Sequence, residues 1–322
     1  MTIEVRDLSK AFGDVRAVNG VSFEVSGGEL FGLLGPNGAG KTTTINMLTG
    51  LARPDRGSIR IGGIDCTENL KAAQHLIGVV PDESNLYPEF TGFENLCFCA
   101  ALYGLRKRER TARARQLLDE FGLSDAADRK FAGYSKGMKR KLTIAAGIIH
   151  RPPILFLDEP TTGIDVASAR QIRQLIAGLN AEGATILLTT HYIEEAERLC
   201  GRIAFIVQGS IVRVDSVSDL LQPLHERHVA LIDLSEPAPA IIDELISVFP
   251  AYRFDALLPG QLRSESNSAL AVGPLVRFLE EAGVEVAEAR RVRPSLEDIF
   301  VQITGIEAGV MRREKEKTGG RK

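Results

Sequence analysis

The sequence predicts an α/β fold in which helices cover a mainly parallel sheet. Two patterns support this prediction: short apolar runs suited to buried strands, and helix-like segments that separate the later runs. The apolar runs are 30–34, 154–157, 185–190 and 203–207. The helix-like segments are 169–180 and 193–199. A glycine-rich loop follows the first run, and this alternation is typical of parallel strands joined by helices.

The other segments of this part follow in chain order. Segments 2–6 and 21–25 alternate well enough for strands, and 43–48 can form a helix. Between about residues 69 and 147 the pattern is mostly helical. This stretch carries a basic run for which a solvated helix face is favoured over a partner contact: Arg106, Lys107, Arg108, Arg110, Arg113 and Arg115.

The chain changes character near residue 222, where a second part with a short α/β pattern begins. Its predicted segments are 229–234, 241–248, 275–282, 284–292 and 295–304. Ser295 fits a helix N-cap because an acidic residue, Asp298, stands at the third helical position. The predicted domains are therefore 1–222 and 223–305, followed by a charged tail, 306–322, that is predicted to be disordered.

Composition excludes several classes of protein. The net charge of -3 indicates no general attraction to nucleic acid or anionic lipid. No apolar stretch approaches the roughly 20 residues that span a bilayer, and the start is unlike a secretory signal, so a cytoplasmic chain is expected. Four cysteines without metal-ligand spacing are predicted to be reduced thiols: Cys66, Cys97, Cys99 and Cys200.

Residues 35–42 read G-P-N-G-A-G-K-T, a phosphate-binding loop between a predicted strand and a predicted helix. Glycines at 35, 38 and 40 let backbone N–H groups surround an anion. Lys41 can reach the outer phosphates, and the Thr42 hydroxyl can ligate Mg²⁺. The strand–loop–helix context disfavours a glycine-rich turn without function, and the sequence therefore predicts nucleotide binding.

A pair of acids at the end of run 154–157 narrows the chemistry, since the loop alone leaves kinases, GTPases and motor ATPases open. Asp158 is placed to hold Mg²⁺ through water, and Glu159 to polarise a water for in-line attack. The alternative is that both are surface acids at a strand terminus.

Three further motifs resemble those of ABC-type ATPases. Residues 134–141, Y-S-K-G-M-K-R-K, resemble their signature loop; 162–165, T-G-I-D, their D-loop; and 189–191, T-T-H, their switch histidine. The resemblance covers about residues 2–215. Residues from 223 onward, which include R-P-S-L-E-D-I-F at 293–300, look like the C-terminal extension of ATP-binding subunits from drug-resistance, sodium-extrusion and related ABC-2 type exporters.

The resemblance implies an ABC-type P-loop nucleotide-binding domain, with a helical subdomain at about 85–150, that binds ATP and Mg²⁺. The positions it implies for ATP contact are Phe12, Gly35, Pro36, Asn37, Gly38, Ala39, Gly40, Lys41, Thr42, Thr43, Ser135, Gly137 and Asp165. The positions it implies for the metal are Thr42, Asp82 and Asp158. Glu159 is implied as the base and His191 as the γ-phosphate sensor, both working with Lys41. Phe12, implied to stack on adenine, could instead be a core residue, and His191 an ordinary satisfied polar residue.

The resemblance also implies partners. Ser135 and Gly137 would bind the γ-phosphate held by an opposite subunit, so the chain should form a homodimer or a heterodimer. A separately encoded integral membrane permease would hold it on the inner face of the cell membrane, and no nucleic acid partner is expected. The alternatives are a non-transport ABC ATPase acting on ribosomes or DNA, an ATP-binding regulatory protein, and a P-loop kinase.

Two positions depart from the usual pattern of that family. Asp82 stands where the family usually has the glutamine that contacts Mg²⁺ and couples to the membrane subunit. A carboxylate can ligate Mg²⁺ but cannot donate a hydrogen bond as an amide can. Lys136 and Met138 replace the glycine and glutamine of the best-known signature loop, a form that favours export over import.

Overall fold

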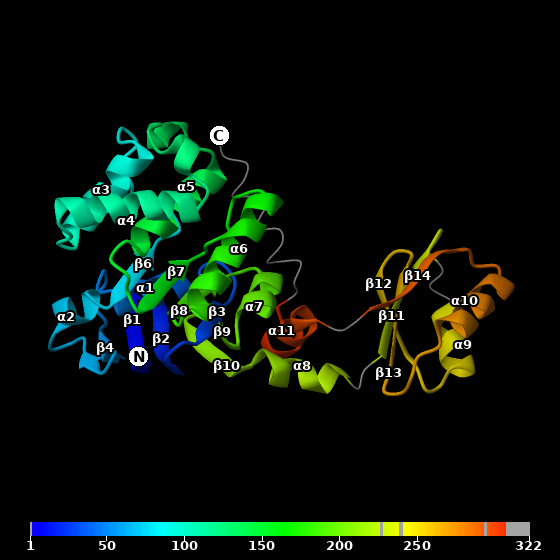
Figure 1. Ribbon diagram of the computed structural model, residues 1–322. Helices are drawn as coiled ribbons and strands as arrows, with labels where there is room; N and C mark the ends of the chain where they lie inside the picture. The colour runs from blue at the N-terminus through cyan, green and yellow to red at the C-terminus, as the bar shows by residue number, and fades with distance from the viewer. Residues whose placement is uncertain (1, 226–227, 238–240, 293–294, 307–322) are drawn as a thin grey trace. The chain divides into compact units, whose positions relative to one another are not determined.

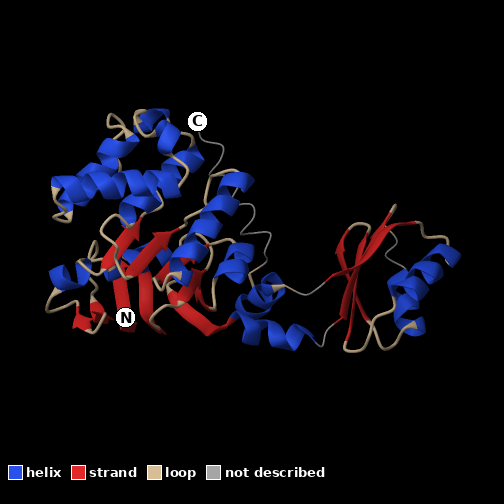
Figure 2. Cartoon of the chain, in the orientation of Figure 1, coloured by secondary structure: helices blue, strands red, loops and turns tan. Residues whose placement is uncertain are grey.

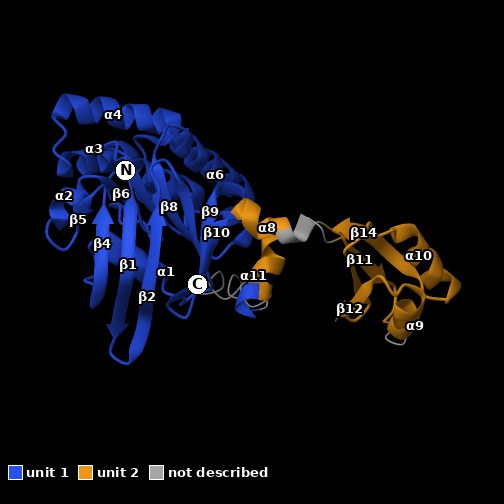
Figure 3. Cartoon of the chain, turned by 90° about the horizontal axis from the view of Figure 1, so that it is seen from below, with its two compact units in different colours: residues 1–216, 303–322 blue, residues 217–302 orange. Residues whose placement is uncertain are grey.

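The computed structural model describes residues 2–225, 228–237, 241–292 and 295–306, which fall into two compact units (Figure 3). The first unit runs to Ser216 and resumes at Ile303; the second is Val217–Gln302. Helix α8 (Val217–His225) spans residue 222, where the sequence predicts that the domains divide. That boundary remains a prediction. Apart from Ile306, the predicted disordered tail lies outside the described residues.

A six-stranded sheet forms the centre of the first unit, with strand order β10-β9-β3-β8-β7-β6 (Figures 1 and 2). Its strands are β3 (Leu30–Leu34), β6 (Ile77–Val80), β7 (Ile154–Asp158), β8 (Thr185–Thr190), β9 (Arg202–Val207) and β10 (Ser210–Ser216). All pairs are parallel except β9 with β10. Because parallel strands end at the same edge of a sheet, the residues that follow β3, β6, β7 and β8 meet there.

An antiparallel sheet, β2-β1-β4-β5, lies beside the first. Its strands are β1 (Ile3–Phe12), β2 (Val15–Val25), β4 (Arg56–Ile61) and β5 (Ile64–Asp65). One apolar core joins both sheets and helix α1 (Lys41–Leu48); it contains Val21 of β2, Ile45 of α1 and Phe156 of β7. This packing fixes the start of α1 beside the ends of the parallel strands.

The remaining helices of the first unit are α2 (Leu70–Gln74), α3 (Gly92–Leu102), α4 (Lys107–Glu120), α5 (Lys136–Gly147), α6 (Val166–Ala181) and α7 (Ile193–Leu199). Two short 3₁₀ turns, η1 (Ser124–Ala126) and η2 (Phe131–Gly133), precede α5. Helices α3, α4 and α5 contact one another and form the helical group seen in Figure 1. Thr91 and Glu94 form a capping box that fixes the start of α3.

The second unit begins with α8, continues with the chain order βαββαβ and ends in α11, and its strands form one antiparallel sheet, β12-β13-β11-β14. Its elements are β11 (His228–Leu234), α9 (Ile241–Val248), β12 (Arg253–Leu258), β13 (Gln261–Ser266), α10 (Val272–Glu281), β14 (Val286–Val292) and α11 (Leu296–Thr304). Leu245 of α9 and Leu275 of α10 are buried in one core with Ile232 of the central strand β11. The predicted start of α11 is confirmed, since the Asp298 carboxylate accepts hydrogen bonds from Ser295 N–H and Oγ–H, at 2.9 and 3.2 Å.

The long apolar or strongly periodic segments match their predictions, with β3, β8, α7 and α9 ending at the predicted residues. The mostly helical prediction for 69–147 missed β6, because a strand of four residues between two helices leaves little pattern. Strand β13 was also missed: its buried positions include Ser264 and Ser266, so its sequence lacks apolar alternation. In the basic run, Arg110 and Arg113 are half-buried and the other four residues are exposed.

Candidate active site

Main-chain carbonyls of two other segments lie against the phosphate-binding loop, which explains why two of its residues are glycine. A Cβ at Gly35 would lie 2.1 Å from the Ile206 carbonyl oxygen, and one at Gly40 would lie 2.4 Å from that of Ala17. Gly40 also has a φ of 100°, a conformation that other residues rarely adopt. Helix α1 begins at the next residue, so the free N–H groups of its first turn are available to an anion.

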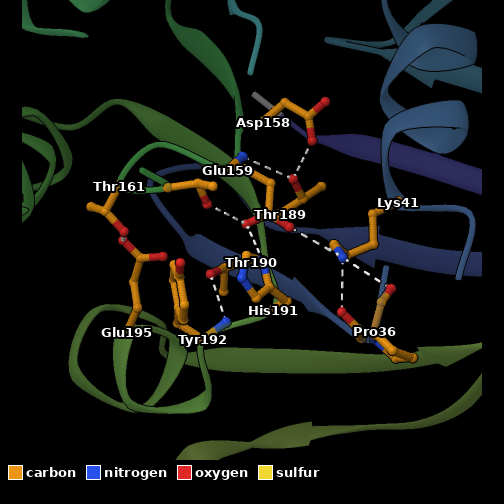
Figure 4. A network of polar contacts seen from close by, with 12 residues as sticks. Pro36, Lys41, Asp158, Glu159, Thr161, Thr189, Thr190, His191, Tyr192 and Glu195 are labelled. Carbon is orange, nitrogen blue, oxygen red and sulfur yellow. Dashed lines mark hydrogen bonds and ion pairs between the residues drawn. The ribbon is translucent and has the colours of Figure 1, made fainter. Parts of the chain in front are cut away.

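Two predicted site residues, Lys41 and His191, converge on the carboxylate of a third, Glu159 (Figure 4). Lys41 Nζ lies 3.1 Å from Glu159 Oε1, and His191 Nδ1 lies 2.8 Å from Glu159 Oε2. Lys41 Nζ also donates to the carbonyl oxygens of Gly35 and Pro36, at 2.8 and 3.1 Å. Since a carboxylate only accepts hydrogen bonds, His191 must carry its proton on Nδ1. The structure thus brings Lys41, Glu159 and His191 together, and their roles remain predictions.

The charge state of Glu159 follows from these contacts. Burial alone would raise the pKa of its carboxyl, but the hydrogen bond from His191 and the charge of Lys41 outweigh burial, so the pKa lies below its ordinary value of 4.5. The side chain therefore remains a carboxylate at neutral pH. Only 7% of the residue is exposed, so the alternative of a surface acid is wrong for Glu159.

Asp158 lies at the end of β7 and is 3% exposed, so it is not a surface acid either. Thr189 of β8 donates its hydroxyl to Asp158 Oδ1. The same hydroxyl oxygen accepts the N–H of Glu159 at 3.2 Å. Thr189 therefore orients both acids from the neighbouring strand.

The oxygens at this edge of the sheet suit Mg²⁺, a hard cation that is usually held by one or two carboxylates together with substrate phosphates. The candidates are the Asp158 carboxylate, the exposed Thr42 hydroxyl at the start of α1 and the exposed Asp82 carboxylate after β6. Although the surface of Asp82 is exposed, the protein atoms around its carboxyl partly desolvate it and raise its pKa, and the charge of Arg140 opposes this. No cluster of three histidine, cysteine or acidic side chains suited to a metal occurs among the described residues.

The signature and D-loop residues form a second cluster. Ser135 is the N-cap of α5, where its hydroxyl accepts the N–H of Met138 at 3.2 Å, and Asp165 is the N-cap of α6. A Cβ at Gly137 would lie 2.3 Å from Ser168 Oγ and 3.9 Å from Asp165 Oδ2, so the two helix starts are neighbours. In the part of the chain that is described, no hydrogen bond or ion pair joins Ser135, Gly137 or Asp165 to Lys41, Glu159 or His191.

Phe12 stands at the end of β1 with 55% of its surface exposed, so the alternative of a core phenylalanine is wrong. The Lys10 ammonium lies 5.4 Å from the centre of its ring. Of the other predicted nucleotide contacts, Asn37 and Gly38 are exposed, Pro36 and Thr43 are half-buried and Ala39 is buried.

Sequence reasoning missed three side chains that support the acids. Arg140 is 7% exposed and binds main-chain carbonyls on both sides of Glu159. Thr162 Oγ1 donates to Glu159 Oε2 at 3.0 Å. Thr161 Oγ1 donates to Glu195 Oε1 at 2.7 Å, which links the turn after β7 to α7. One signal was available for Arg140 in the sequence: the spacing places it on the same helix face as the apolar Ile144 and the small Gly147, a face that the structure buries.

Known proteins resemble this chain in sequence. Residues 18–162 match the family described as ABC transporter. The chain is 36% identical over 307 residues to the linearmycin resistance ATP-binding protein LnrL of Bacillus subtilis, across 94% of this chain and 98% of that protein. It is 42% identical over 317 residues to Nod factor export ATP-binding protein I of Paraburkholderia xenovorans, across 95% and 97%.

Solved structures match about two thirds of the chain. The structure of an ATP-binding subunit of an ABC transporter has a TM-score of 0.63 at 33% identity, covering 70% of this chain and 94% of that one. A dimeric, post-hydrolysis ATP-binding cassette bound to ADP and phosphate has a TM-score of 0.62 at 27% identity, covering 67% and 98%. This chain therefore belongs to the ABC transporter family, in which it is an ATP-binding subunit that hydrolyses ATP to drive transport.

Proposed function

We propose that this chain is the ATPase subunit of an exporter and works on a separate integral membrane permease. One observation carries the proposal: relatives named for linearmycin resistance and Nod factor export align with 94% and 95% of this chain, the second unit included. The solved cassettes cover only 70% and 67%. We propose small molecules such as drugs or lipids as the exported class.

Glu159 is proposed as the general base. Its carboxylate holds Lys41 through one oxygen and His191 through the other, and both of those residues are proposed to contact the γ-phosphate. A phosphate that draws Lys41 away leaves Oε1 free to accept a proton from water. In this proposal the base is released only when the substrate phosphate is in place, which couples hydrolysis to ATP binding.

The metal is proposed to be Mg²⁺, held by Thr42, Asp158 and Asp82. When bound it would neutralise charge on the β- and γ-phosphates. The chain's own contribution is orientation: Thr189 holds the Asp158 carboxylate through its hydroxyl. Phe12, whose ring is exposed, is proposed to stack on adenine.

ATP-binding cassettes dimerise, as in the related dimeric structures. We propose that Ser135, Gly137 and Asp165 contact the nucleotide of the opposite subunit, in a homodimer or a heterodimer. An intact γ-phosphate then bridges both subunits, and its hydrolysis reopens them.

Attachment to the inner face of the membrane is proposed to occur through the permease. Among the described residues, the helices are too short or too polar to cross a bilayer.

Affinity purification from detergent-solubilised membranes of the source cell tests this function, with mass spectrometry of the partners and with or without ATP. Recovery of one polytopic membrane protein is the expected result. Ribosomal, DNA-bound or only soluble partners would contradict transport and favour the alternative of a non-transport ATPase.

A further inference from the structure

Arg140 lies on α5, five residues beyond the signature serine, and only 7% of it is exposed. We propose that Arg140 is a positioning residue, which fixes the backbone of Glu159 and ties it to the loop at Asp82. This inference rests on the proposed role of Glu159 as the base.

All five N–H groups of the guanidinium are used, each for a main-chain carbonyl. Nη2 donates to the carbonyl oxygens of Asp158, at 2.6 Å, and of Glu159, while Nε donates to that of Pro160 at 2.8 Å. Nη1 donates to the carbonyl oxygens of Pro81 and Asp82. One side chain therefore joins the turn after β7 to the loop after β6.

The two bonds from Nη2 have a specific geometric effect. They hold the peptide groups before and after the Glu159 Cα, and the relative orientation of these two groups is what φ and ψ of Glu159 describe. The φ of Glu159 is 48°, in the left-handed region that residues with a Cβ rarely occupy. Such a conformation persists only where the surroundings impose it. Two main-chain hydrogen bonds restrain the same turn: the Thr189 carbonyl accepts the Glu159 N–H at 3.1 Å, and the Glu159 carbonyl accepts the Thr162 N–H at 3.2 Å.

This backbone conformation aims the side chain of Glu159 at Lys41 and His191 (Figure 4). A change in the turn would move the carboxylate away from the γ-phosphate site while leaving the phosphate-binding loop intact. Because the same guanidinium binds residues 81 and 82, a displacement of that loop would be felt at the base. Arg140 thus adds a direct hydrogen-bonded connection between the two segments, beyond the pairing of β6 with β7.

The variant Arg140→Lys tests the positioning role. A lysine ammonium has three N–H groups on a compact head and cannot reach five carbonyls in two segments. We expect kcat for ATP hydrolysis to fall about 10- to 100-fold, with KM for ATP changed less than about twofold, since misplacing a reacting group affects the chemical step. Arg113→Lys, at a half-buried arginine of α4, is the matched control and should keep the wild-type kcat.

A double-mutant cycle separates positioning from general structural support. If Arg140 acts through Glu159, adding Arg140→Lys to Glu159→Gln should lower the single-turnover rate by less than about twofold further. A loss equal to that in the wild-type background would overturn the proposal. If the single variant Glu159→Gln hydrolyses ATP normally, the assignment of Glu159 as the base fails. If Glu159→Gln is impaired but the single variant Arg140→Lys keeps its full kcat, the positioning role of Arg140 fails and the base assignment stands.

Thermal melting and ATP affinity establish whether Arg140→Lys is folded. If it is not, Arg140→Ala is assayed with methylguanidinium or methylammonium at equal, non-denaturing concentrations. Rescue of kcat by methylguanidinium alone supports the proposal. Equal rescue by both cations, or rescue by neither, overturns it.

Discussion

Lys41 Nζ and Glu159 Oε1 form a buried ion pair, 3.1 Å long, between side chains that are 5% and 9% exposed. A buried charge without a partner destabilises the protein, so each of the two groups needs a new partner when the ion pair separates. An incoming phosphate can replace the carboxylate as the partner of Lys41. Binding and chemistry therefore compete for the same contacts at this site.

Replacing Glu159 with glutamine should lower the steady-state ATPase rate by about 100-fold or more, because the general base is lost. The same change should tighten ATP binding several-fold, because Lys41 no longer has to leave a carboxylate. Single-turnover phosphate release and equilibrium binding of ATP measure the two effects. Size-exclusion chromatography with light scattering should show a dimer that persists with ATP; a monomer with ATP, or normal turnover, would contradict the assigned base.

The stability of the protein in acid should depend on Glu159. The folded-state pKa of this carboxyl lies below its ordinary value of 4.5, because the contacts with His191 and Lys41 outweigh burial. The stabilisation is therefore complete above that ordinary value and is lost as the pH falls through the folded pKa. The wild type should melt higher than Glu159→Gln near about pH 6, and the gap should narrow towards about pH 3. A difference in melting temperature that widens in acid would show that the pKa of Glu159 is not lowered in the folded state.

The substitution Asp82→Gln should keep ATPase activity, because an amide oxygen can replace a carboxylate oxygen as a hard ligand. Arg140 binds the carbonyl of residue 82 and not its side chain, so the loop should hold its position. Steady-state ATPase assays across a Mg²⁺ titration measure the effect. Complete inactivation would show that the carboxylate itself has a specific role.

The substitution Thr189→Val keeps the shape of a buried strand residue but removes the hydroxyl that joins Asp158 to the Glu159 N–H. The free energy of unfolding should fall by about 1–2 kcal/mol, since a buried carboxylate loses a donor. The Mg²⁺ concentration for half-maximal activity should rise several-fold. Thr49→Val, a buried threonine at the C-cap of α1, is a control that should leave the Mg²⁺ response unchanged.

The long buried strands and the amphipathic helices were predictable, because burial alone decides which of their residues are apolar. The strand 30–34 is buried at every position and therefore reads as a continuous apolar run. Helix α9 buries a single face and therefore shows apolar residues at helical spacing. Strand β6 has only four residues, and β13 buries two serines, so neither carries such a pattern. The order of the strands in each sheet was not predictable, because it depends on contacts between segments that are distant in the sequence.

The phosphate loop and the acids were predictable because their chemistry restricts the residue types. The contacts of Arg140 were not, because main-chain carbonyls carry no sequence signal and any residue could supply them. The left-handed conformation of Glu159 was equally hidden, since glycine is the residue that usually marks it.

The path of the chain through the two units affects how the protein can be shortened. The first unit includes the stretch from Ile303, beyond the whole of Val217–Gln302. A stop codon at position 223 would therefore also remove 303–306, residues that belong to the ATPase unit. A deletion that follows this division excises 217–302, which cuts α11 after Gln302, and rejoins the chain with a flexible linker. Only that version would separate the second unit's contribution to transport from damage to the ATPase itself.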